Sequence, residues 1–121
     1  MHSFRAAVEA GDIDAAVALL ADDVVFHSPV AFKPYEGRAT VEAILRAVFT
    51  VFEDFRYVRE IVATPDAALV FEARIGERAL TGCDFVHVDE DGLIDDFMVM
   101  VRPLSGVQAL GEAMAAKLSA R

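Results

Sequence analysis

The chain of 121 residues has a formal net charge of −9, and 55% of its residues are hydrophobic. This length corresponds to one domain, placed at residues 1–121, with enough apolar residues for a single core. The negative charge argues against nucleic acid and anionic membrane surfaces as partners, because both select basic proteins. The lone cysteine, Cys83, excludes an internal disulfide. Because the sequence also shows no signal-like start and no apolar run of membrane-spanning length, we expect a cytoplasmic protein.

The first third of the chain is predicted to form two short helices, a strand and a loop. A first helix is expected to end at Gly11. Asp12 can cap a second helix, whose apolar residues repeat with i, i+3, i+4, i+7 spacing: Ile13, Ala16, Val17 and Leu20. Residues 24–27 (VVFH) predict a short strand, and residues 28–38 predict a loop because two prolines and a glycine interrupt regular structure.

The rest of the chain is predicted to form a helix, four strands and a last helix. A wide apolar stripe over residues 41–52 is typical of a helix that packs on a sheet. Four strand-like segments follow, at residues 55–64, 67–75, 78–88 and 93–102. Their short, turn-forming connections require antiparallel pairing, since parallel strands need a long crossover. Helical spacing resumes from Ser105. Helices followed by a meander predict an α+β fold, in which a curved antiparallel sheet carries helices on one face.

This order of elements, together with three motifs, resembles the nuclear transport factor 2-like superfamily, which includes ketosteroid isomerases and SnoaL-like polyketide cyclases. The motifs are AGDIDAAVALLADDVVFHSPV at residues 10–30, PYEGRATVEAIL at 34–45 and GCDFVHVDEDGLI at 82–94. The resemblance implies a cone, in which the sheet wraps around the helices and encloses a pocket. It implies no single activity, because this superfamily hosts isomerases, cyclases, dehydratases, hydrolases and non-enzymatic modules.

Asp84 is the strongest candidate for a functional group. It lies within an apolar strand, and alternation places it on the same face as Leu80, Gly82, Val86 and Val88. A buried aspartate needs a partner or a role, since burial of a charge is costly. The resemblance places Asp84 where ketosteroid isomerases keep a protonated aspartic acid that donates to an oxyanion. The alternative is a structural aspartate that is hydrogen-bonded to a neighbouring strand or loop.

The remaining isomerase residues are replaced. Ser28 stands where the resemblance places the general base, and Phe4 stands where it places the oxyanion-hole tyrosine. Neither residue can take over those roles, so a ketosteroid isomerase mechanism is disfavoured. His27 is the candidate substitute base, because its ordinary pKa lies near neutrality. Strict alternation with Phe26 and Ser28 in the cavity turns His27 outward, which leaves an outer-face or interface role open.

No metal or cofactor is expected. His2, His27 and His87 are scattered and form no ligand motif, and the glycines form no phosphate or dinucleotide loop. His87 shares a face with Cys83, opposite Asp84, where we expect an interface residue. A homodimer through this outer sheet face is expected, because the apolar content exceeds what one small core hides.

The residues together predict a small-molecule pocket protein. We expect an apolar or cyclic ligand, with Asp84 as acid or oxyanion donor and His27 as possible base, in isomerisation, cyclisation or dehydration. The alternative is a non-catalytic dimerisation or ligand-binding module. The sequence leaves the direction of the Tyr57 side chain open. The predicted pocket residues are Phe26, Ser28, Val48, Phe52, Tyr57, Phe71, Val86 and Phe97.

Overall fold

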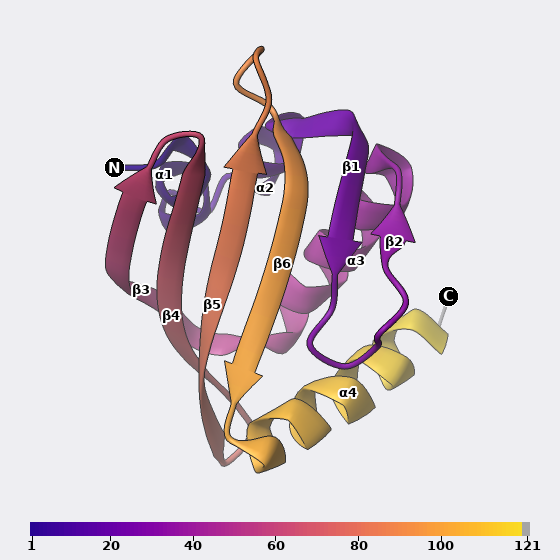
Figure 1. The fold of residues 1–121 in the computed structure, drawn as a ribbon. Helices are drawn as coiled ribbons and strands as arrows, with labels where there is room; N and C mark the ends of the chain where they lie inside the picture. The colour runs from indigo at the N-terminus through magenta and orange to yellow at the C-terminus, as the bar shows by residue number, and fades with distance from the viewer. Residues whose placement is uncertain (120–121) are drawn as a thin grey trace.

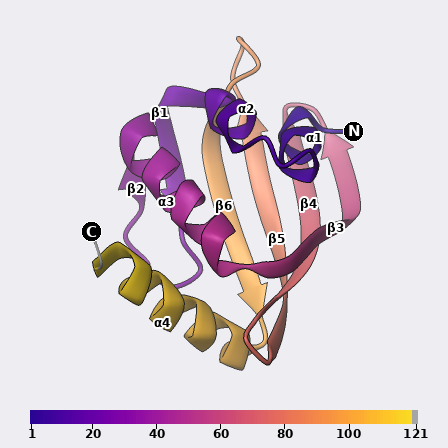
Figure 2. The same ribbon diagram turned by 180° about the vertical axis from the view of Figure 1, so that it is seen from behind.

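The computed structural model describes residues 1–119, which form one six-stranded sheet with four helices on one of its faces (Figure 1, Figure 2). The helices are α1 (Ser3–Glu9), α2 (Ile13–Ala18), α3 (Arg38–Val51) and α4 (Leu104–Ser119). The strands are β1 (Leu20–His27), β2 (Tyr35–Glu36), β3 (Glu53–Ala63), β4 (Asp66–Ile75), β5 (Arg78–Val88) and β6 (Ile94–Arg102). Their order across the sheet is β2-β1-β6-β5-β4-β3.

The α+β prediction and the antiparallel meander are confirmed. β3 pairs with β4, β4 with β5 and β5 with β6, all antiparallel, through the short connections predicted from turn chemistry. Asp12 caps α2 as expected, because its carboxylate accepts a hydrogen bond from the backbone N–H of Ala15 at 3.0 Å. Within residues 1–119, no helix has the length and apolar character needed to cross a bilayer.

Two local predictions are wrong. Leu20 starts β1 instead of ending the second helix, and the strand is therefore longer than residues 24–27. Exposed Asp22 and Asp23 interrupt the apolar pattern of β1, so the local pattern does not indicate the first half of this strand. The predicted loop contains β2, which pairs with β1, while β1 runs parallel to β6. These pairings join segments far apart in the chain, so local patterns do not reveal them.

The inner face of the sheet carries a close contact between β4 and β5. Phe71 and Gly82 are direct partners in the register of these strands. A Cβ atom at Gly82 would collide with the Phe71 ring, so glycine is required for the ring to lie across β5. This packing brings Phe71 next to Asp84, which follows Gly82 on the same face.

The helix α4 closes the lower end of the structure in the view of Figure 2, where it crosses beneath α3. Its first turns are anchored: Gly106, Ala109 and Leu110 are buried. A Cβ atom at Gly106 would lie 2.8 Å from Cβ of Leu80, so glycine allows the helix to rest directly on β5. The anchored helix lies across the concave face of the sheet and encloses the space between the sheet and α3.

Candidate functional site

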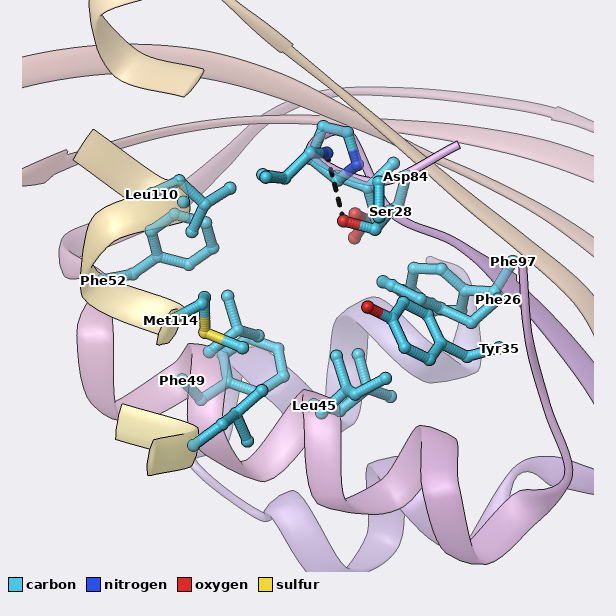
Figure 3. A pocket seen from close by; sticks show the side chains of 18 of the residues that line it. Phe26, Ser28, Tyr35, Leu45, Phe49, Phe52, Asp84, Phe97, Leu110 and Met114 are labelled. Carbon is cyan, nitrogen blue, oxygen red and sulfur yellow. Dashed lines mark hydrogen bonds between the residues drawn. The ribbon is translucent and has the colours of Figure 1, made fainter. Parts of the chain in front are cut away.

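A cavity of about 250 Å³ lies between the inner face of the sheet, α3, α4 and the segment that joins β1 to β2 (Figure 3). Six of the eight predicted pocket residues line it: Phe26, Ser28, Val48, Phe52, Phe71 and Phe97. Val86 is instead part of the solid core, and Tyr57 lies beside the cavity without lining it. Val86 is the register partner of Phe97 on the neighbouring strand, and both side chains are buried in the core.

Aromatic rings form one end of the cavity. Phe55 stacks on Phe71 with ring centroids 4.8 Å apart, and Phe52 lies 5.5 Å from Phe71. Phe49 of α3 contacts Phe55 edge-to-face at 5.7 Å. Such a wall suits a flat, apolar ring in either stacked or edge-on contact. The wall contains two residues, Phe49 and Phe55, that were not predicted as pocket residues, although Phe49 belongs to the apolar stripe of the predicted helix.

Asp84 is the only buried charged side chain within residues 1–119, with 5% of its surface exposed. The strand β5 directs it into the cavity, where its neighbours are mainly apolar (Figure 3). The hydroxyl of Tyr57 donates a hydrogen bond to Oδ2 of Asp84 at 2.9 Å. Burial raises the pKa of Asp84 from 3.8 to about 7, although the Tyr57 hydrogen bond acts in the opposite direction. Asp84 is therefore poised between its neutral and charged forms at neutral pH.

Tyr57 is held behind Asp84 by residues of α1 and β3. Its own pKa is raised, first by burial and then by the neighbouring carboxylate, so it remains a hydrogen-bond donor. The guanidinium of Arg5 lies 5.9 Å from the centre of the Tyr57 ring and forms an ion pair with Glu60 at 3.6 Å. These contacts keep the tyrosine hydroxyl directed at one oxygen of Asp84. The other oxygen, Oδ1, has no hydrogen-bond partner among residues 1–119.

Two further polar side chains reach the cavity. Ser28 lines it, and its hydroxyl oxygen accepts a hydrogen bond from the backbone N–H of Val30 at 3.1 Å. Tyr35 of β2 directs its hydroxyl into the cavity (Figure 3). The local sequence pattern does not place Tyr35 in the cavity, because β2 has two residues and is too short for alternation to indicate a face. The pairing of Tyr35 with inward-facing Phe26 is the signal that places it.

The structure does not bring His27 to Asp84. His27 continues the alternation of β1 onto the outer face of the sheet, where its Nε2 lies 3.0 Å from Oδ1 of Asp96. It is absent from the cavity wall, and this geometry does not support a role as the base. His87 also faces outward, 2.7 Å from Asp95, and this contact raises the pKa of the imidazole.

Phe4, at the position discussed for the oxyanion-hole tyrosine, is fully buried and packs edge-to-face on Phe97 at 5.2 Å. It therefore contributes to the core beneath the cavity and offers no donor. No group of three or more histidine, cysteine or acidic side chains within residues 1–119 is arranged to hold a metal ion. In the part of the chain that the structure describes, the polar chemistry of the cavity rests on Asp84, Ser28 and Tyr35.

The fold and the site define an α+β cone with an apolar pocket and a buried acid, Asp84. The chain belongs to the SnoaL-like domain family, whose model matches residues 1–97, within the nuclear transport factor 2-like, ketosteroid isomerase-like superfamily. The chain is 47% identical to a protein from Pseudomonas aeruginosa described as a steroid delta-isomerase, with a TM-score of 0.90 over 95% of this chain and 85% of that one.

Two further structures resemble the chain. An uncharacterized bacterial protein with a cystatin-like fold from Silicibacter pomeroyi is 40% identical, with a TM-score of 0.91 over 98% of this chain and 87% of that one. A putative ketosteroid isomerase from Kribbella flavida is 21% identical, with a TM-score of 0.69 over 84% and 73%, and this likeness supports the fold alone. No curated protein sequence matches the chain.

Proposed function

We propose that the protein binds a small, mainly apolar cyclic compound with a carbonyl oxygen, and that protonated Asp84 donates a hydrogen bond to that oxygen. The observation that carries this proposal is the buried carboxyl group in an apolar cavity, with Tyr57 bound to one oxygen only. Because Tyr57 already donates to Oδ2, the acidic proton belongs on Oδ1, the oxygen left for a ligand. A few polar groups in an apolar cavity are the usual arrangement for such ligands.

Proton transfer within the bound ligand is the chemistry that this site favours. Asp84 titrates near neutral pH, so both its forms are available and one carboxyl group can give a proton and take one back. In double-bond migration of a β,γ-unsaturated ketone, the charged form of Asp84 removes a proton beside the carbonyl. The neutral acid formed in this step then returns the proton at the γ carbon, which restores the carboxylate. The 47% identical protein described as a steroid delta-isomerase supports chemistry of this kind.

A non-catalytic binding module is the second candidate. It is favoured by the absence of any other carboxylate or histidine from the cavity wall within residues 1–119, since His27 faces away. A module of this kind would use the neutral Asp84 only as a hydrogen-bond donor that selects ligands with an oxygen. The two candidates share the ligand and differ only in turnover.

The binding step is tested with 1-tetralone and with tetralin, which lacks the oxygen. We expect 1-tetralone to bind roughly tenfold more tightly in isothermal titration calorimetry at pH 6, since a buried hydrogen bond contributes about 1.4 kcal/mol. Asp84→Leu removes this difference, whereas Asp84→Asn, which keeps an N–H donor, retains most of it. Equal affinity for the two compounds in the wild-type protein contradicts the proposal.

Turnover is measured with cyclohex-3-enone by following the absorbance of the conjugated product. Formation of cyclohex-2-enone that is lost in Asp84→Leu supports catalysis. Binding of 1-tetralone without any such turnover favours the binding module.

We also propose that the outer face of the sheet binds a second copy of this chain. Three large apolar side chains lie exposed on this face: Ile61 (56%), Phe85 (39%) and Met100 (54%). Arg56 and Arg59 lie on the edge strand β3, and Glu36 lies on the opposite edge strand β2. Asp96 lies on β6, two strands in from the β2 edge. A two-fold axis parallel to the strands places each basic edge over the partner's acidic edge, which is a self-complementary arrangement.

Phe85→Glu tests this interface, because a charge at the centre of an apolar contact is costly to bury. We expect the wild-type protein to sediment as a dimer in analytical ultracentrifugation and the variant to sediment as a monomer. Phe32→Glu is the matched control, since Phe32 is fully exposed in the segment between β1 and β2. A monomeric wild-type protein, or a dimer unaffected by Phe85→Glu, contradicts the interface.

A further inference from the structure

We propose that α4 is the wall that sets ligand size, and that it restricts the pocket to compounds of one or two rings. This inference rests on the proposed function, because it concerns the ligand that Asp84 binds. It adds the size class of that ligand and the residues that determine it. The four-ring skeleton of a steroid is excluded from this class.

The size of the cavity is the first observation. The cavity has a volume of about 250 Å³. Pockets for drug-sized molecules span roughly 300–1,000 Å³, so this cavity lies below that range. One ring, or two fused rings with short substituents, fill it. The four fused rings of a steroid have a larger volume than this cavity.

The position of α4 is the second observation. Leu110, Met114 and Leu118 are spaced four residues apart and line the cavity from one face of the helix. Leu110 and Met114 lie on the side of the cavity opposite Phe26, Phe97 and Tyr35 (Figure 3). The helix therefore limits how far a ligand extends from the strands. It also lies beyond residues 1–97, the part of the chain that matches the family model, so this wall is not part of the matched segment.

Two close contacts of α4 explain why this helix lies near the sheet and narrows the cavity. At one end, Gly106 rests on Leu80 of β5, where a Cβ atom would lie 2.8 Å from the leucine Cβ. Further along, a Cβ atom at Gly111 would lie 3.1 Å from Cγ1 of Val30, which belongs to the segment between β1 and β2. Because Gly106 and Gly111 have no side chains, α4 lies closer to β5 and to the β1–β2 segment than larger residues at these two positions would allow. Both contacts hold its cavity-facing side chains inside the cone.

The expected selectivity is tested with 1-tetralone as the two-ring probe and androst-4-ene-3,17-dione as the four-ring probe. We expect the wild-type protein to bind 1-tetralone at least roughly tenfold more tightly, since steric exclusion of this kind exceeds the effect of one methylene group. Met114→Ala with Leu118→Ala shortens two wall residues that are only partly buried. This double variant is expected to bind the four-ring ketone roughly tenfold more tightly than the wild-type protein does.

A second variant changes the wall in the opposite direction. Ala115 lines the cavity but is exposed, so Ala115→Phe adds bulk without disturbing the core. We expect it to weaken 1-tetralone binding roughly tenfold. Val107→Ala is the matched control on the same helix, because Val107 does not line the cavity, and it should leave both affinities unchanged.

The outcomes separate this inference from the proposed function. If the wild-type protein binds both ketones equally well, and Asp84→Leu weakens both, the size limit is wrong while the role of Asp84 stands. Unchanged selectivity in both the Met114/Leu118 double variant and Ala115→Phe likewise rejects α4 as the determinant. If neither ketone binds the wild-type protein, the proposed function fails and the size limit fails with it.

Discussion

The free energy of unfolding is expected to fall by about 4 kcal/mol between pH 4 and pH 8 because of Asp84 alone. Its pKa is 3.8 when the chain is unfolded and about 7 in the folded protein, where burial disfavours the charge. Below pH 3.8 Asp84 is protonated in both the folded and the unfolded protein, so its burial costs no stability through an unfavourable charge. Between these two pKa values the folded state binds more protons than the unfolded state, so stability decreases as pH rises, and it levels off above pH 7.

Asp84→Asn isolates this effect, since asparagine has the same shape and no charge. At pH 8 we expect the variant to be more stable than the wild-type protein by about 4 kcal/mol, and at pH 4 the two should be nearly equal. Urea denaturation followed by circular dichroism across this range measures the difference. Asp23→Asn, at an exposed position of β1, is the control and should change little at any pH. A constant difference between wild type and Asp84→Asn from pH 4 to pH 8 rules out a desolvated, neutral Asp84.

Tyr57→Phe is expected to raise the pKa of Asp84 above 7 and to destabilise the protein most at high pH. The tyrosine hydroxyl stabilises the charged carboxylate through the 2.9 Å hydrogen bond, and its removal favours the protonated form. A hydrogen bond to a charged group contributes about 1.5–3 kcal/mol, and one to a neutral group about 1 kcal/mol. The loss in unfolding free energy should therefore be about 1 kcal/mol at pH 5 and two to three times as large at pH 8.

The measurement is an NMR titration of the Asp84 carboxyl carbon, combined with urea denaturation at both pH values. Tyr35→Phe is the matched control, because Tyr35 also reaches the cavity, yet its hydroxyl makes no hydrogen bond to Asp84 within residues 1–119. A pKa that stays the same or falls in Tyr57→Phe would show that the hydroxyl does not stabilise the carboxylate. The wild-type titration also tests the proposed function directly, since a pKa near 4 removes the neutral donor.

The buried acid and the meander are the features that local sequence patterns anticipated best. Short connections with turn-forming residues leave antiparallel pairing as the only possibility for β3 to β6, so topology followed from spacing. Once β5 is a strand, alternation places Asp84 with Leu80 and Val86 on one face. An acid among such neighbours is desolvated wherever that face packs, and its raised pKa follows from burial.

The partners of Asp84 depended on pairings between distant segments. Tyr57 and Asp84 lie on β3 and β5, with β4 between them, and the Tyr57 hydroxyl reaches the carboxyl group across β4. His27 is turned away because β1 continues its alternation beside β6. The local pattern does not settle which way the side chains of Tyr57 and His27 point, since a bulge or a strand end can reverse the face that a side chain occupies.

The amino-acid sequence by itself determined the α+β class, the antiparallel meander and the buried position of Asp84, because these depend on periodicity and on short connections. Only the tertiary structure decided that Tyr57 binds Asp84, that His27 faces outward and that Tyr35 and α4 close the cavity. These features arise where β1, β2 and α4 meet elements far away in the chain. Such contacts are set by the packing of the whole molecule, and no local spacing of residues encodes them separately.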